Sequence, residues 1–304
     1  MKFKNNQILC FGEVLWDKLP SGAKPGGAPM NVALHLNNIG HDVVIASKVG
    51  DDEAGRELIN FLQSSGLRTD LIQVDESLPT SEVLVHLDKN NNATYEICEP
   101  VAWDKLDLTD SLLKKTKNSG LFIYGTLASR NSESRQTLLS LLECDTVKLI
   151  DVNLRKPHDS REIVELLLSK SDIVKLNDDE LVAIAKWHNK HELDEKFMVS
   201  WFAEQYKAEM ICVTRGNKGA LLYSDRQFIE HSGFNVEAVD TVGAGDAFLA
   251  GFVAAIFEGK LYSEALVNAC ATGAFVATKD GATPKYDKVQ INQIIYSNSI
   301  SECT

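Results

Sequence analysis

Short apolar runs alternate along this chain with amphipathic segments that are long enough to form helices. This alternation is typical of βαβ units, in which parallel strands are covered by helices on both faces of the sheet. The runs that predict strands are residues 8–11, 43–46, 121–124, 147–151, 173–176 and 210–214. We therefore expect an α/β fold in which a mostly parallel sheet is flanked by helices.

One region, residues 80–103, departs from this alternation. Two extended runs there flank the Asn-rich stretch 89–92, which predicts an antiparallel hairpin. Together with an excursion at residues 14–24, the hairpin would form a small β-sheet over the carboxyl edge of the main sheet, where α/β proteins bind their ligands. We expect a single domain over residues 1–304, with lid insertions at about 13–25 and 79–103. An edge hairpin without a role in binding is the alternative.

Charge and hydrophobicity argue against several classes of protein. The net charge of −12 argues against a nucleic-acid partner, because phosphate backbones require a basic surface. No apolar run approaches a membrane span, which takes about 18 residues, and the N-terminal residues lack the apolar stretch of a signal peptide. The cysteines include no C-x-x-C pair. We expect a cytoplasmic protein that contacts neither membranes nor nucleic acid.

A turn of small residues leads into an apolar helix at residues 240–248. Its glycines allow several backbone N–H groups to point into one concavity, and a helix beginning at about Ala244 adds its positive dipole end. This run predicts an anion site in which the amides of Gly243, Ala244 and Gly245 stabilise a transferring phosphoryl group. Asp246, in the first helical turn, would accept the proton of an attacking hydroxyl. An ordinary N-terminal helix cap is the alternative.

A second glycine turn lies near the N-terminus, between a strand and a helix. The pair Gly26 and Gly27 allows a ligand to approach the backbone closely. Asp17 and Asn31 lie beside this turn and have no obvious place in the core. A carboxylate and an amide suit a ligand with many hydroxyl groups, since together they accept and donate hydrogen bonds. The alternative is a solvated Asp and a helix-capping Asn.

Both turns resemble signatures of one enzyme family. Residues 240–246 match the C-terminal signature D-T-x-G-A-G-D of the ribokinase-like (PfkB) carbohydrate kinases at every fixed position, and the residues of the second turn fall on positions that contact sugar in that family. The resemblance spans residues 12–284 and implies a ribokinase-like fold with a β-sheet lid. It also implies transfer of the γ-phosphoryl group of ATP to a primary hydroxyl of a small sugar, with Mg²⁺ as cofactor. A non-catalytic sugar or nucleotide sensor is the alternative, but Asp246 favours the enzyme, because a sensor needs no base in its anion site.

Weaker elements at strand ends resemble further contacts of the same family. The resemblance assigns the nucleotide to Asn177, Thr214, Gly216, Gly219, Thr241, Asn268 and Gly281. It assigns phosphate or sugar to Arg155, whose guanidinium suits bidentate pairing with phosphate. Glu180 would hold Mg²⁺ through water, since that ion keeps much of its hydration. Taken alone, these elements also fit structural roles: a helix N-terminus at Glu180, a hairpin turn at 214–219 and a surface arginine.

The expected substrate follows from resemblance to the fructokinase branch of the family. Residues 26–29 and 100–104 resemble that branch, which favours fructose; ribose and 2-keto-3-deoxygluconate are the alternatives. Many fructokinase-like chains carry a basic residue just before the aromatics of the second lid strand, whereas this chain reads Asn-Asn-Ala-Thr-Tyr at 91–95. Tyr95 would stack on the sugar or pack within the lid. The resemblance further implies a monovalent cation such as K⁺ near residue 240, and an edge of the lid could pair with a second subunit in a homodimer.

Overall fold

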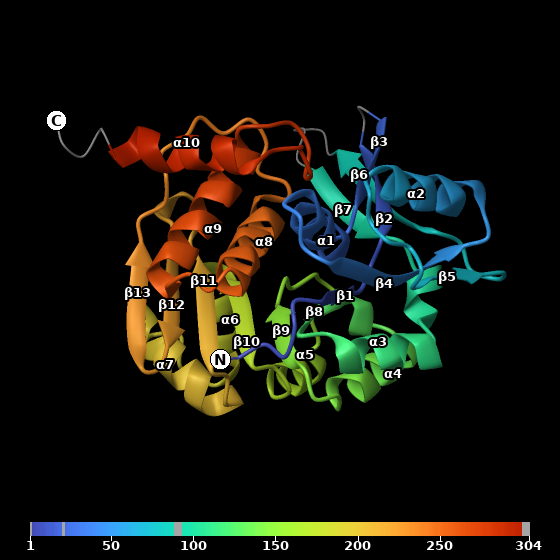
Figure 1. The fold of residues 1–304 in the computed structure, drawn as a ribbon. Coiled ribbons are helices and arrows are strands. Elements are labelled where there is room, and N and C mark those ends of the chain that lie inside the picture. Colours follow the sequence, from blue (N-terminus) through green and yellow to red (C-terminus); the bar gives the residue numbers. More distant parts are fainter. Residues whose placement is uncertain (1, 20–21, 88–92, 300–304) are drawn as a thin grey trace.

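The computed structural model describes residues 2–19, 22–87 and 93–299, and it contains two separate β-sheets (Figure 1). The larger sheet has nine strands. In spatial order they are β13 (Gln227–His231), β12 (Ala220–Ser224), β11 (Met210–Thr214), β10 (Ile173–Asn177), β9 (Val147–Asp151), β8 (Leu121–Gly125), β1 (Ile8–Phe11), β4 (Val43–Gly50) and β5 (Ile72–Asp75). Neighbouring strands are parallel from β5 to β11, whereas β12 and β13 are antiparallel. The expected α/β fold is thus confirmed, and each expected parallel strand is present.

Helices cover both faces of this sheet because its central strands are apolar on both sides. In β1, Leu9 and Phe11 face one helical layer, whereas Ile8 and Cys10 face the other. The first layer consists of α3 (Asp110–Asn118), α4 (Ser132–Leu142), α5 (Arg161–Leu168), α6 (Asp178–Trp187) and α7 (Glu195–Tyr206). The second consists of α1 (Ala28–Asn38), α2 (Glu53–Ser64), α8 (Ala244–Phe257) and α9 (Tyr262–Ala277), with α10 (Lys288–Ser299) packed on α9. Of the helices in the described ranges, none has both the length and the hydrophobicity needed to cross a membrane.

The smaller sheet lies beside α1 and α2, at the upper right of Figure 1. Its strands, in spatial order, are β3 (Gly22–Gly26), β2 (Leu15–Leu19), β6 (Ser81–Leu87) and β7 (Ala93–Ile97). β2 pairs with β3 and β6 pairs with β7 in antiparallel fashion, and parallel pairing of β2 with β6 joins the two hairpins. The expected Asn-rich turn lies outside the described residues. Two segments far apart in the sequence therefore build one sheet, as expected.

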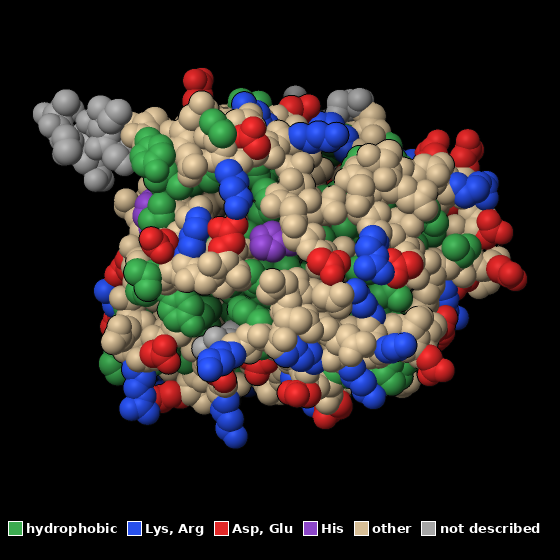
Figure 2. All heavy atoms as spheres, viewed as in Figure 1, with side chains coloured by type: hydrophobic (Ala, Val, Ile, Leu, Met, Phe, Trp, Pro, Cys, Tyr) green, Lys and Arg blue, Asp and Glu red, His purple; other side chains and the backbone are tan. Residues whose placement is uncertain are grey.

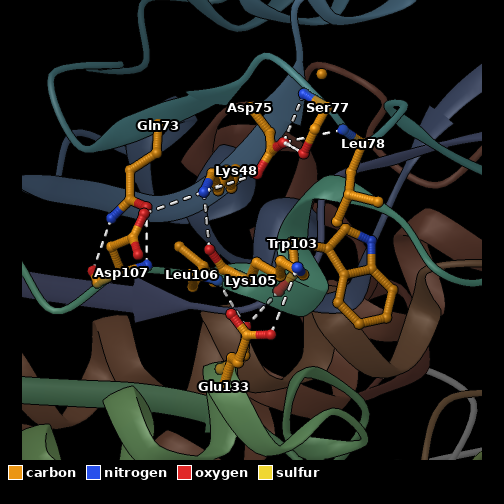
Figure 3. Close-up of polar contacts among 12 residues, drawn as sticks. Lys48, Gln73, Asp75, Ser77, Leu78, Trp103, Lys105, Leu106, Asp107 and Glu133 are labelled. Atoms are coloured by element: carbon orange, nitrogen blue, oxygen red, sulfur yellow. Dashed lines mark hydrogen bonds and ion pairs between the residues drawn. The ribbon is translucent and has the colours of Figure 1, made fainter.

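Buried ion pairs hold the chain just before β6 and just after β7. On the entry side, Lys48 of β4 forms an ion pair of 2.9 Å with Asp75 at the end of β5, and its ammonium also donates to Asp107 (Figure 3). On the exit side, the guanidinium of Arg130 donates to both carboxylate oxygens of Asp104, at 2.7 and 2.8 Å. These contacts hold the base of the smaller sheet against the body of the protein.

The surface carries charges of both signs. On the face shown in Figure 2, the Lys and Arg side chains are interspersed with Asp and Glu side chains, and apolar side chains lie between them. Among the described residues of that face, no broad basic area is visible of the kind that nucleic-acid binding requires.

Candidate active site

The centre of the site is the first turn of α8. Gly243 caps this helix with a φ of 76°, and a Cβ at that position would lie 2.5 Å from the carbonyl oxygen of Ala282. Only glycine fits both this conformation and this close approach. Asp246 follows in the first turn, where its Oδ2 accepts a hydrogen bond of 2.8 Å from the Nδ2 amide of Asn31 in α1. The side chains expected to serve as base and as sugar ligand are thus in direct contact.

The electrostatic surroundings of Asp246 suit a proton acceptor. Burial and the charge of Asp151 raise the pKa of Asp246 to about 6, while the bond from Asn31 and the positive charges of Lys175 and Arg155 oppose that rise. A carboxyl with this pKa is mostly ionised at neutral pH, yet binds a proton more strongly than an ordinary aspartate. These surroundings are compatible with a general base, and Gly243 rather than Asp246 occupies the cap position of α8.

A buried ion pair lies directly beneath this turn. Lys175 of β10 and Asp151 of β9 are register partners on adjacent strands, and the ammonium lies 2.9 Å from both carboxylate oxygens. A Cβ built on Gly245 would lie 3.4 Å from the same ammonium. No role was predicted for Lys175 from its sequence context. The available signal was a charged residue within an otherwise apolar strand, since such residues are seldom buried without a partner.

The sugar-binding residues expected from the sequence gather at the N-terminus of α1. Gly27 caps α1 with a φ of 119°. The carboxylate of Asp17, on β2, packs so closely over Gly26 on β3 that any Cβ at position 26 would overlap it. Burial raises the pKa of Asp17, and the charge of Arg155 opposes the rise. Because the charge of Arg155 also acts on Asp246, these groups surround one site.

Glu13 is a further buried acid at this site, to which the sequence analysis gave no role. Its side chain is 3% exposed, and within the described part of the chain its Oε2 atom has no hydrogen-bond partner. Burial raises the pKa of Glu13 to about 7 against the lowering effects of Arg155 and of the backbone at Ala28. Glu13 borders a narrow cavity together with Asp151 and Asn153. A carboxyl held near half-protonation can donate as well as accept a hydrogen bond.

Most of the expected nucleotide residues lie around the same strand ends. Asn177 ends β10 and Thr214 ends β11, and the two residues are register partners. Gly216 and Gly219 follow β11 with φ values of 56° and 81°, so the turn needs their conformational freedom. The structure also shows the hairpin weighed as the alternative, because β11 turns directly back into β12. A hairpin and a nucleotide loop are therefore compatible here.

Two loops meet beside the anion turn, one between β13 and α8 and the other between α9 and α10. The carbonyl of Thr241 accepts a hydrogen bond of 3.2 Å from the N–H of Ala244, at the start of α8. The N–H of Gly281 donates to Oδ2 of Asp240 at 3.2 Å. Thr241 and Gly281 therefore lie beside the glycine turn, as a nucleotide site at this position would require.

Asn268 lies apart from the other expected nucleotide residues. In the antiparallel pair formed by α8 and α9, Gly273 packs against the carbonyl of Ala244, whereas Asn268 packs against Gly251, about two helical turns further from the anion site. The Asn268 side chain donates to the carbonyl of Glu264, within its own helix. The structure does not bring Asn268 to the strand ends.

The carboxylate of Glu180 is committed to the backbone. Its Oε2 accepts from the N–H of Asn177 at 2.9 Å and its Oε1 from the N–H of Leu154 at 2.8 Å, while the Asn177 side chain caps the N–H of Glu180. This capping box is the structural role weighed for the residue. Each oxygen keeps a second lone pair, so contact with hydrated Mg²⁺ stays compatible with these bonds.

Arg155 and Tyr95 complete the expected set. Arg155 is exposed, and its charge lowers the pKa values of three surrounding acids, Glu13, Asp17 and Asp246. This places an exposed cation beside the three acids, suited to pairing with phosphate. Tyr95 lies on β7 opposite Val85, but its side chain is outside the described part of the structure.

Comparison with known proteins agrees with this geometry. The model of the pfkB family of carbohydrate kinases matches residues 21–288. Probable fructokinase-5 of Arabidopsis thaliana is 30% identical over 91% of this chain and 93% of its own length, and fructokinase-2 of Solanum habrochaites is 28% identical over 91% and 92%.

Solved structures share the fold at lower identity. Fructokinase from Xylella fastidiosa with bound ATP superposes with a TM-score of 0.83 at 23% identity, over 97% of this chain and 99% of that one. A fructokinase double mutant from Vibrio cholerae O395, with fructose, ADP and potassium bound, gives 0.83 at 22% identity, over 97% and 100%. By the extent of the family match, this chain belongs to the pfkB family of carbohydrate kinases.

Proposed function

We propose that this protein is an ATP-dependent fructokinase that transfers the γ-phosphoryl group to a primary hydroxyl of the sugar. The observation that carries the proposal is the Asp246 carboxylate, held by Asn31 at the N-terminus of α8 beside a glycine turn. Membership of the carbohydrate kinase family supports the reaction, and relatives named as fructokinases support the sugar.

The mechanism follows from these positions. Asp246 takes the proton of the attacking hydroxyl, while the amides at Gly243, Ala244 and Gly245 and the positive end of α8 stabilise the transferring group. Asp17 and Asn31 hold other hydroxyls of the sugar, so that the attacking oxygen lies near both the base and the phosphorus. Asn31 donates to Asp246 through Nδ2 and leaves Oδ1 without a partner among the described residues, ready for a ligand hydroxyl.

The smaller sheet acts as a lid in this proposal. It carries Asp17 and is joined to the body just before β6 and just after β7, so closing it over the sugar would exclude water and limit ATP hydrolysis. Lys24 on β3 already forms an ion pair of 2.9 Å with Asp280, in the loop beside the anion turn. The lid therefore meets the nucleotide side of the site as well as the sugar side.

Two cations complete the proposal. Mg²⁺ fits at Glu180 through bound water, and when bound it supplies charge neutralisation on the phosphates. A monovalent cation such as K⁺ would bind near Asp240 and the loop with Gly281, as the resemblance to the family implies. The fructokinase of Vibrio cholerae O395 solved with potassium supports that second expectation.

The decisive experiment is incubation of the protein with ATP, Mg²⁺ and a panel of sugars. We expect a higher kcat/KM for D-fructose than for ribose or 2-keto-3-deoxygluconate, because residues 26–29 and 100–104 resemble the fructokinase branch. The stretch 91–95 also lacks the basic residue that would pair with a sugar acid, and a buried unpaired carboxylate is costly. If ribose or the keto acid wins by about tenfold, or roughly 1.4 kcal/mol in transition-state binding, the fructose assignment is wrong and a kinase of another sugar remains.

A further inference from the structure

Helix α1 presents two polar side chains on one face toward the site. Asn31 and His35 are four residues apart, so they lie one above the other on the helix surface. Asn31 donates to Asp246. His35 is 1% exposed, and its ring bridges two groups of the loop between α9 and α10: Nε2 lies 3.0 Å from the carbonyl oxygen of Ala282, and Nδ1 lies 3.1 Å from the hydroxyl of Tyr286.

These partners fix the protonation of the ring. A carbonyl oxygen only accepts hydrogen bonds, so Nε2 of His35 must carry a hydrogen and donate it to Ala282. Burial lowers the pKa of His35 to about 4, even though the bond to Ala282 opposes that change, so the ring is neutral at physiological pH. Nδ1 is then the acceptor for the hydroxyl of Tyr286, and both ring nitrogens are satisfied.

The carbonyl that His35 holds is the one that touches the anion turn. A Cβ on Gly243 would lie 2.5 Å from the oxygen of Ala282 and 2.6 Å from its Cα, so Ala282 packs directly against the residue that caps α8. The loop is also attached on its other side, where the N–H of Gly281 donates to Asp240. The position of the glycine turn therefore depends on where the Ala282 carbonyl is held.

We propose that His35 is a positioning residue for phosphoryl transfer, which holds the Ala282 carbonyl and thereby fixes the Gly243 turn. One face of α1 would then align both parts of the chemistry: Asn31 orients the proton acceptor, and His35 supports the amides that stabilise the transferring group. His35 touches neither substrate in this arrangement. The inference rests on the proposed kinase site.

The test uses two substitutions that separate the two hydrogen bonds of the ring. In His35→Gln the terminal amide nitrogen falls near the place of Nε2 and can still donate to Ala282. In His35→Asn the shorter amide falls near the place of Nδ1, can accept from Tyr286 and does not reach Ala282. Both variants bury a neutral amide at the same point of α1, so each controls for the polarity of the other.

We expect kcat to fall about 10- to 30-fold in His35→Asn and less than about threefold in His35→Gln, with the KM for sugar changed less than about threefold in both. Small displacements of preorganised groups cost rate rather than binding. Tyr286→Phe, which leaves the donation to Ala282 in place, should keep kcat within about threefold. Rates are normalised to the folded fraction measured by thermal melting.

Equal kcat values for folded His35→Gln and His35→Asn would overturn the inference, whether both are normal or both are low. If His35→Asn does not fold, a tenfold loss of kcat in folded His35→Gln overturns it instead, and a kcat within threefold supports it. Asp246→Asn, assayed in parallel, distinguishes failure of the proposed kinase site from failure of the positioning role of His35. Normal turnover of that variant would refute the kinase site itself, whereas an inactive Asp246→Asn beside two normal His35 variants refutes only the positioning role.

Discussion

Two buried lysine–aspartate pairs in this molecule have nearly the same geometry but different neighbouring residues. Lys48 and Asp75 lie 2.9 Å apart with side chains 8% and 9% exposed, and Lys175 and Asp151 lie 2.9 Å apart at 10% and 7%. The first pair contacts backbone groups, the hydroxyl of Ser77 and the exposed carboxylate of Asp107, all at the base of the smaller sheet (Figure 3). The second has the titratable groups Glu180 and Asp246 as neighbours. We therefore expect the neighbours of a buried pair, rather than its burial and geometry, to indicate whether it takes part in catalysis.

The largest effect is expected for substitution of Asp246, which is a neighbour of the second pair. Asp246→Asn keeps the size and much of the hydrogen bonding of the side chain but cannot accept a proton, so kcat should fall by roughly 10² to 10⁴. Sugar affinity, measured by calorimetry, should change little. A folded Asp246→Asn protein with near-normal turnover would remove the distinction between the two pairs, because neither would then adjoin a catalytic base.

Breaking each pair from the lysine side tests the comparison directly. Lys48→Met and Lys175→Met should each cost about 3 kcal/mol of stability, since each leaves a buried carboxylate without its cation. Only Lys175→Met should also lower kcat per folded molecule, by roughly tenfold or more. The ammonium of Lys175 lowers the pKa of Asp246, so its loss should move the acidic limb of the pH–rate profile to higher pH.

Equal kcat losses in the two variants would show that the pairs do not differ in function. The stability of each variant is measured by urea unfolding, and turnover is measured at urea concentrations well below the unfolding midpoint.

Glu13 is a third buried acid, and its Oε2 has no hydrogen-bond partner among the described residues, so its ionisation should reduce the stability of the fold. Its pKa is raised from 4.5 to about 7 in the folded protein, so the folded state binds more protons than the unfolded state between those values. Its stabilising contribution is complete below pH 4.5 and is lost as pH rises to about 7, a change of about 3 kcal/mol. Glu13→Gln should remove this loss and be relatively more stable than the parent at pH 8 than at pH 5. Parallel stability curves for the two proteins would refute the assignment.

The smallest expected effect concerns the lid side of the site. Asp17→Ala should weaken sugar binding by about 1–3 kcal/mol, because a hydroxyl would lose its partner in a closed site. ATP binding without sugar should hardly change, and calorimetry with each ligand measures both. Equal losses for the two ligands would indicate a damaged fold rather than a lost contact.

The sequence predicted the parts of this molecule whose cause is local. Parallel strands were predicted because they are continuous apolar runs, and the place of Asp246 in the first turn of a helix because a glycine turn precedes it in the chain. The short edge strand β5 was missed, since it is only half buried and includes Val74, which is 52% exposed. Whether an edge segment forms a strand depends on packing against its neighbour as well as on its own composition.

The residues missed at the site depend on partners far along the chain. Lys175 is placed by Asp151 on the adjacent strand, and His35 is placed by Ala282 and Tyr286, which lie near the other end of the sequence. From the sequence alone, His35 is only a polar residue within a predicted helix. Its environment exists only after the sheet has brought α1 and the loop before α10 together.

The pairing of β2 with β6 has a consequence for the order of folding. These strands are separated in the chain by β3, α1, β4, α2 and β5, so their contact closes a long loop and gains its free energy only after that loop is ordered. The two hairpins cannot form a shared sheet until the helices and strands between them have taken their places. The smaller sheet, which we propose as the lid of the site, is thus expected to be one of the last parts of the protein to assemble, and a partly folded chain would lack the closed chamber in which the proposed kinase retains its sugar.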